Sequence, residues 1–205
     1  QDLGSFWQME HQYVKPYPVC RWAHAPVDAL RQVMLEHGLS HDQLARIRIS
    51  TFHESACLYP GIPVTTSQAQ YSLGFAVAVQ AAYGRIGVEH ISGAGLSDPL
   101  VASIHERISV AEAARHSVRF PACRVADVVV TLTDGRVIES GDVHARGGPE
   151  APFSRQDVER KFMEFAAPVL GAARASAIRD AVLGFTRDGS KFSDLSRLIY
   201  GAPAV

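Results

Sequence analysis

The densest group of residues that could do chemistry lies between residues 13 and 24, in the segment YVKPYPVCRWAH. It contains Lys15, Cys20, Arg21 and His24 on a stretch of backbone that two prolines restrict. Arginine offers a carboxylate a planar fork and lysine offers a movable point charge, so this pair suits an anionic ligand. His24 could exchange protons near neutral pH, and Cys20 could do so if neighbouring cations stabilise its thiolate.

A second cluster, His53, Glu54, Cys57 and Tyr59, follows a predicted strand, and loops at strand ends often carry functional side chains. Both clusters also have a plain structural interpretation, in which the aromatic residues pack and the charged ones face water. The sequence has no CxxC, no His/Cys pair at zinc spacing, no HExxH and no Gly-x-Ser-x-Gly. We therefore expect neither a metal nor an organic cofactor.

Apolar periodicity and turn chemistry predict the elements that position these clusters. Spacing predicts a helix from Pro26 to just before Gly38, and alternation predicts a strand over residues 47–51. A buried, apolar helix is expected from Thr65 or Thr66 to about Gly84.

Further along, Asp98-Pro99 predicts the start of a helix whose apolar stripe runs to Ile108. The β-branched run 125–132 followed by Asp134-Gly135 predicts a hairpin. Ser154 with Asp157 resembles a capping box at the start of three closing helices. The order predicts an α+β fold, with an antiparallel sheet and packed helices in residues 1–150 and a carboxyl-terminal helical segment in residues 151–205.

Composition excludes several classes of function. A formal net charge of −1 gives no reason to expect nucleic acid or an acidic membrane as a partner. The longest apolar run, residues 73–83, is too short to span a bilayer. Three separated cysteines favour reduced thiols and a cytoplasmic location. Because the first residue is not Met and no signal pattern follows it, we expect the chain to begin inside a longer polypeptide.

The strip KPYPVCRW (15–22), with His24 and Asp28-Ala29, resembles the KPYPxCR segment of the MmgE/PrpD family. Three further matches follow in the family's order: Pro63-x-Thr65 with AQYSL (69–73), Phe120-Pro121-Ala122 with Asp134-Gly135-Arg136, and Gly148, Pro152 and Ser154 with Lys161-Phe162. The resemblance spans about residues 13–165.

This family contains 2-methylcitrate dehydratase, cis-aconitate decarboxylase and iminodisuccinate epimerase. The resemblance implies a cofactor-independent enzyme with a large helical domain, a smaller α+β lid, and an active site between them. This chain resembles the lid and the returning carboxyl-terminal helices. We therefore expect the helical domain as a partner, a small polycarboxylate as substrate, and a homodimer.

On this resemblance Lys15 matches the lid lysine that binds substrate carboxylates and handles protons. Cys20 stands where the decarboxylase branch has a catalytic histidine, which argues against cis-aconitate decarboxylation. We predict that Lys15 and Cys20 are catalytic and that Arg21, His24 and Tyr59 bind substrate.

The activity expected from this resemblance is a lyase of the hydratase/dehydratase type, which removes a proton α to a carboxylate and stabilises the developing enolate-like charge. Three alternatives remain: an epimerase of an amino-dicarboxylate, a catalytically incomplete lid fragment, and a small-anion binding module.

Overall fold

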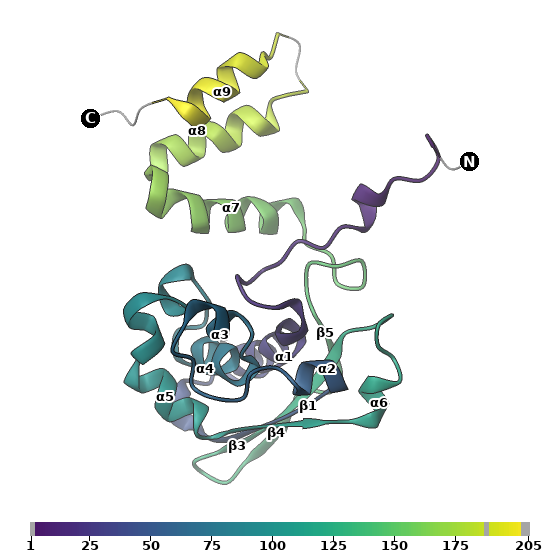
Figure 1. Cartoon of the computed structure of the whole chain (residues 1–205), viewed down its shortest axis with the longest axis vertical. Coiled ribbons are helices and arrows are strands. Elements are labelled where there is room, and N and C mark those ends of the chain that lie inside the picture. Colours follow the sequence, from purple (N-terminus) through teal and green to yellow (C-terminus); the bar gives the residue numbers. More distant parts are fainter. Residues whose placement is uncertain (1–2, 187–188, 202–205) are drawn as a thin grey trace. The chain divides into compact units, whose positions relative to one another are not determined.

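The computed structural model describes residues 3–186 and 189–201. The chain forms two compact units, Gln1–Pro152 and Phe153–Val205 (Figure 1). A sheet and the helices that pack on it make up the first unit, and the second consists of three helices.

The sheet of the first unit has five strands in the order β2-β1-β3-β4, with β5 also paired to β3. Their bounds are β1 Leu44–Thr51, β2 Ile108–Glu112, β3 Val125–Leu132, β4 Val137–Glu139 and β5 Val143–His144. β3 runs antiparallel to β1, β4 and β5, whereas β2 runs parallel to β1. The α+β fold class is confirmed, but the expectation of a wholly antiparallel sheet was wrong, because the sheet is mixed.

The prediction that the helix starting at Asp98-Pro99 has an apolar stripe reaching Ile108 was wrong, because Ile108 belongs to the parallel edge strand β2. Helix α5 (Pro99–His105) begins where the Asp98 carboxylate accepts the N–H groups of Leu100 and Val101, and it ends before Ile108. Ile108 opens β2 and lies opposite Ile47 of β1. Its spacing suits a helical stripe equally well, because a short apolar run does not reveal which strand lies beside it.

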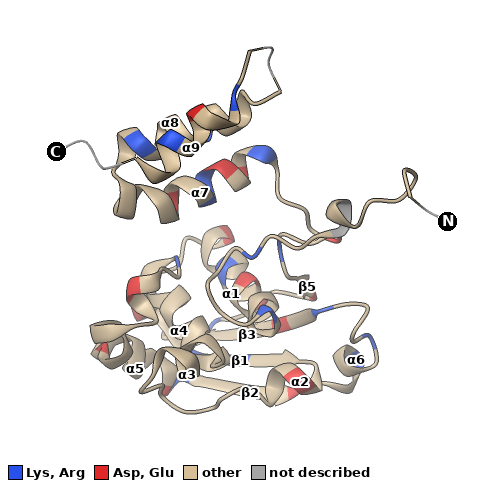
Figure 2. Ribbon diagram, turned by 45° about the horizontal axis from the view of Figure 1, so that its top comes forward, with Lys and Arg blue, Asp and Glu red and all other residues tan. Residues whose placement is uncertain are grey.

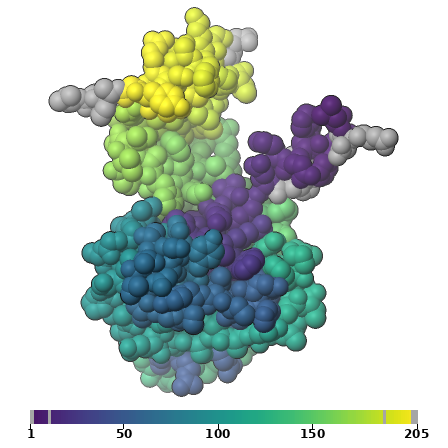
Figure 3. Space-filling view, viewed as in Figure 1, coloured from purple at the N-terminus to yellow at the C-terminus, as the bar shows by residue number. Residues whose placement is uncertain are grey.

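Helices α1 (His24–Glu36) and α4 (Leu73–Tyr83) cover one face of the sheet (Figures 1 and 2). Along β1, Ile47 and Ile49 are buried while Arg46 and Arg48 are exposed, as the predicted alternation requires. The shorter helices of this unit are α2 (His53–Ala56), α3 (Thr66–Gln70) and α6 (Ala114–Ser117), with 3₁₀ turns at Gln8–His11, Arg21–Ala23, His41–Gln43, Val88–His90 and Gly93–Ser97. In the space-filling view the blue segment that carries α2 and α3 lies on the visible face of this unit (Figure 3).

The single helix expected from Thr65 to Gly84 is in fact two helices, α3 and α4. Ser72 caps the second one, since its hydroxyl accepts the N–H of Phe75 at 3.3 Å. The Tyr71 carbonyl accepts the N–H of Tyr59 at 2.9 Å instead of a helical bond. The helix is thus interrupted where the Tyr71 carbonyl bonds to a residue from another segment. Apolar periodicity alone cannot predict this interruption.

The second unit contains α7 (Arg155–Leu170), α8 (Ala172–Leu183) and α9 (Phe192–Tyr200). The predicted capping box is present at its start: Asp157 N–H donates to Ser154 Oγ at 3.2 Å, and Ser154 N–H donates to Asp157 Oδ2 at 3.0 Å. Arg174 Nε donates to the Leu198 carbonyl at 2.9 Å and ties α8 to the end of α9. Within the described ranges, every helix is too short or too polar to cross a membrane.

Candidate functional site

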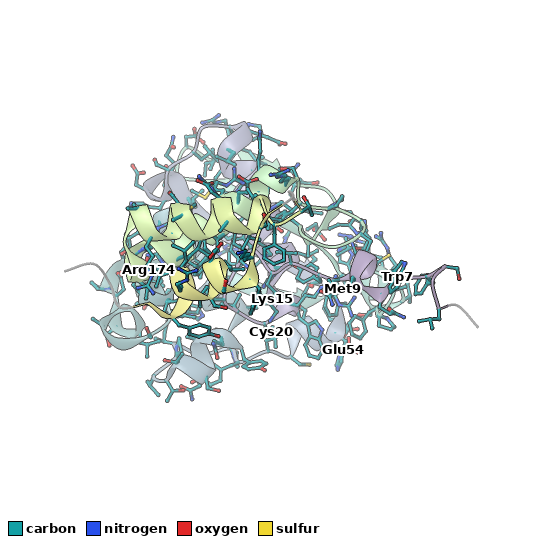
Figure 4. The ribbon with its side chains drawn as sticks, turned by 90° about the horizontal axis from the view of Figure 1, so that it is seen from above. Trp7, Met9, Lys15, Cys20, Glu54 and Arg174 are labelled. Carbon is teal, nitrogen blue, oxygen red and sulfur yellow. The ribbon has the colours of Figure 1, made fainter. Side chains whose placement is uncertain are left out.

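Residues 13–24, which we call the cationic strip, are held at two points by backbone hydrogen bonds. Val14 N–H donates to the Gly147 carbonyl at 2.8 Å, and Cys20 N–H donates to the Gln70 carbonyl at 2.7 Å. The strip then passes through the 3₁₀ turn Arg21–Ala23 directly into α1. Figure 4 labels Lys15 and Cys20 on this strip. The backbone that carries these side chains is therefore fixed at one end to the segment after β5 and at the other end to the last residue of α3.

Lys15 and His24 meet at one acceptor, the Val19 carbonyl oxygen, at 3.2 Å from Lys15 Nζ and 3.1 Å from His24 Nε2. Because a carbonyl only accepts, the proton of a neutral His24 ring lies on Nε2. Nδ1 then accepts the hydroxyl proton of Tyr13 at 2.8 Å. Both ring nitrogens of His24 are thus occupied by the protein, and the residue is fully buried.

Burial first, and then the charges of Lys15, Arg21 and Arg146, lower the pKa of His24 to about 3, although the hydrogen bond to Val19 acts in the opposite direction. His24 is therefore neutral at physiological pH. In this structure it orients Tyr13 and the Val19 turn, and direct contact with a substrate would require one of these partners to leave. Substrate binding by His24 stays a prediction.

Arg21 is the part of the strip that is best prepared for an anion. Its guanidinium carbon lies 3.5 Å from the centre of the Tyr13 ring. Its Nε is buried and has no hydrogen-bond partner among the described residues. Burial and then the nearby charge of Arg124 lower the pKa of Arg21, while the Glu150 carboxylate acts in the opposite direction. The unused Nε donor is inaccessible in this structure, so a carboxylate would bond to it only after the Arg21–Tyr13 stack shifts, and it would then meet a cation that water solvates poorly.

The break between α3 and α4 brings Tyr59 to the same region as Cys20. The consecutive carbonyls of Gln70 and Tyr71 accept the backbone N–H groups of Cys20 and Tyr59 respectively. Tyr59 also lines a cavity of about 120 Å³ together with Ser55, Gly74 and His105. Lys15, Cys20, Arg21 and His24 thus lie on the strip, and the backbone of Tyr59 is hydrogen-bonded to the break that also holds Cys20; the roles of all five stay predictions.

Residues 17–186 match the MmgE/PrpD C-terminal domain. The chain belongs to the MmgE/PrpD family. This confirms the family resemblance that the strip and its companion motifs predicted. The chain is also similar to a protein named cis-aconitate decarboxylase from Aspergillus terreus, with 23% identity over 208 residues. That alignment covers 96% of this chain and 41% of the relative, so the chain spans less than half the length of the relative.

Sequence reasoning missed three residues of this MmgE/PrpD domain that anchor the strip by hydrogen bonds: Tyr17, Asp28 and Arg146. Tyr17 donates its hydroxyl to Asp28 Oδ1 at 2.7 Å, and Arg146 Nη2 donates to the Tyr17 oxygen at 2.8 Å. Asp28 was noted only as part of a motif, and Arg146 was not singled out at all. The signal for Asp28 was its charge on the apolar start of α1, because a buried carboxylate requires a partner.

One cluster of the MmgE/PrpD domain has the composition of a metal site. His116, Asp127 and Asp142 offer ligand atoms within 4.8 Å of one another. Arg115, however, donates to Asp127 at 2.5 Å and to Asp142 at 3.0 Å, and Arg119 donates to Asp142 at 2.7 Å. Two guanidinium groups already compensate the carboxylates, so this arrangement is typical of an ion-pair network.

Proposed function

We propose that this domain supplies the carboxylate-binding wall of a cofactor-independent lyase that acts on a small polycarboxylate. The observation that carries the proposal is the concentration of positive charge on the strip. Lys15 is exposed and its ammonium rests on the neutral Val19 carbonyl, while the Nε donor of Arg21 is unused among the described residues. Two such cations on one fixed backbone suit a ligand with more than one carboxylate.

The chemistry that we propose is removal of a proton α to a carboxylate, followed by loss of a β-hydroxyl group as water. Carboxylate binding by Lys15 and Arg21 would stabilise the negative charge that develops as the proton leaves. Cys20, next to Arg21 in the chain, is the candidate for proton transfer, with Tyr59 as a hydrogen-bonding partner of the substrate. His24 is proposed to act through Tyr13, whose position it sets.

Calorimetry with 2-methylcitrate and citrate tests the proposed wall on the chain as it stands. The Lys15→Ala variant should bind either ligand about tenfold more weakly, because one charged hydrogen bond contributes roughly 1.5 kcal/mol or more. Lys191→Ala, at an exposed lysine of the second unit, is the matched control and should bind like the wild type. Equal affinity in the Lys15→Ala and wild-type proteins would remove Lys15 from the site.

Product analysis separates dehydration from the alternatives. We propose that turnover requires a helical MmgE/PrpD domain in addition to this chain, so each assay is run with and without such a domain. Loss of water from 2-methylcitrate supports the proposal, whereas inversion of iminodisuccinate or release of carbon dioxide from cis-aconitate would replace it by another reaction. Turnover by the chain alone would show that no partner domain is needed.

A further inference from the structure

A second group of reactive side chains lies outside the strip, between α2, β2 and α6. The Cys57 sulfur is 3.6 Å from His53 Nε2, and His53 Nδ1 is 2.9 Å from Glu112 Oε2. Ser117 Oγ donates to the other oxygen of Glu112 at 2.7 Å and accepts the backbone N–H of His53 at 3.0 Å. A thiol, an imidazole and a carboxylate are therefore connected in that order, and the hydroxyl of Ser117 fixes the carboxylate.

This order of groups is the one that activates a nucleophile. The carboxylate of Glu112 accepts the Nδ1 proton of His53 and so directs Nε2 toward the thiol. The hydrogen bond to Glu112 and then its charge raise the pKa of His53. The hydrogen bonds from His53 and then Ser117 lower the pKa of Glu112. Both effects favour an imidazolium beside the sulfur, and an imidazolium stabilises a thiolate.

The surroundings of Cys57 leave it open to a reagent of moderate size. Cys57 is exposed, and the His53 and Glu112 side chains are 62% and 45% exposed. The charged groups that face this site are Glu54 from α2 and Glu112 from β2, and the second is already paired with His53. Cys20 and Cys123 are half-buried, and within the described part of the chain neither sulfur is hydrogen-bonded to a histidine as that of Cys57 is.

We propose that Cys57 is a nucleophilic thiol, activated by His53 and Glu112, that exchanges with small disulfides and is thereby modified reversibly. The thiol proton passes to His53 Nε2, and the thiolate attacks one sulfur of the incoming disulfide. A new S–S bond to Cys57 forms as the original S–S bond breaks. The departing thiolate takes the proton from His53, so one thiol and one disulfide give one mixed disulfide and one thiol.

The probe is 4,4′-dithiodipyridine, a small neutral disulfide whose released thione absorbs light, with peptide mapping to assign each modified cysteine. An ordinary thiol is only a few per cent ionised at pH 7, so full activation can raise the rate by about thirtyfold. We expect Cys57 to react about tenfold faster than Cys123 at pH 7, and about tenfold faster in the wild type than in His53→Gln. Glu112→Gln should give an intermediate rate.

The rate at Cys123, measured in every variant in the same experiment, shows whether the fold has changed. If Cys57 reacts at the same rate in the wild type and His53→Gln while Cys123 is unaffected, the proposed activation is wrong. A wild-type Cys57 that reacts no faster than Cys123 would also overturn it. Neither result depends on the polycarboxylate proposal, because the probe carries no carboxylate.

Discussion

Asp28 and Arg146, 118 residues apart in the chain, are joined by two hydrogen bonds. The backbone N–H of Arg146 donates to Asp28 Oδ2 at 2.9 Å, and its Nε donates to Asp28 Oδ1 at 2.8 Å. The Asp28 side chain is 3% exposed and that of Arg146 is 28% exposed. Since Tyr17 of the strip also donates to Asp28, this pair ties the strip, α1 and the segment after β5 into one unit.

Replacement of Asp28 should therefore destabilise the first unit strongly. In Asp28→Ala, the Tyr17 hydroxyl and two donors of Arg146 lose their acceptor in a largely buried setting. We expect the free energy of unfolding to fall by about 3 kcal/mol, as measured by urea denaturation. The control is Arg136→Ala, which removes the exposed pair with Asp134 but keeps the Asp134 hydrogen bond to the backbone of the turn, and which should change stability little. A loss no larger than in that control would contradict the role given to Asp28.

His24 should make stability depend on pH in acid. Its pKa is about 3 in the folded protein and close to 6.5 in an unfolded chain, so between these values only the unfolded state binds the proton. Its contribution is fully present above about pH 6.5 and is lost as pH falls toward 3, by up to roughly 1.4 kcal/mol per pH unit.

The variant His24→Gln tests this, because an amide can still donate to Val19 and accept from Tyr13 without titrating. Urea unfolding of both proteins is measured at several pH values between about 3.5 and 7. In the difference between their free energies of unfolding, the contributions of the carboxylates that both proteins share cancel. We expect the advantage of the wild type to shrink steadily in acid. A difference that stays constant with pH would show that His24 is not held neutral.

Gly148 should control the position of Arg21. A Cβ built on Gly148 would lie 3.0 Å from a carbon of the Tyr13 ring and 3.1 Å from Arg21 Nη2. Gly148→Ala should displace this stack and weaken citrate binding by about tenfold, since small errors in placing a charged group are costly to a site. Pro149→Ala, at the exposed neighbouring residue, should bind citrate like the wild type in the same calorimetric titration. Unchanged binding by Gly148→Ala would show that the Arg21–Tyr13 stack does not belong to the site.

Gly84 should affect the stability of the protein through its backbone conformation alone. It ends α4 in the left-handed region, with φ of 68°, and a Cβ there would meet no atom within 4 Å. Gly84→Ala should therefore cost about 1 kcal/mol of stability through backbone strain, and Gly84→Asn should cost less because asparagine tolerates this region. Thermal unfolding of the two variants measures the order, and equal losses would contradict this explanation.

Much of the fold could be predicted where local chemistry decides it. The strand over residues 125–132, the turn at Asp134-Gly135 and the capping box of Ser154 and Asp157 occur where the sequence predicts them. Each depends on residues a few positions apart, so the interactions that form the element are visible in the sequence. The cationic strip was also visible, because its lysine, cysteine, arginine and histidine lie within ten residues.

The sequence by itself determined the α+β class, the family and the residues of the strip, because composition, periodicity and motif order are properties of the chain alone. Only the tertiary structure decided that β2 runs parallel to β1, that Tyr71 gives its carbonyl to Tyr59, and that His24 is neutral. Strand pairing, burial and the partners of buried charges depend on contacts between segments far apart in the chain. Local sequence patterns do not predict which distant segment will be the neighbour.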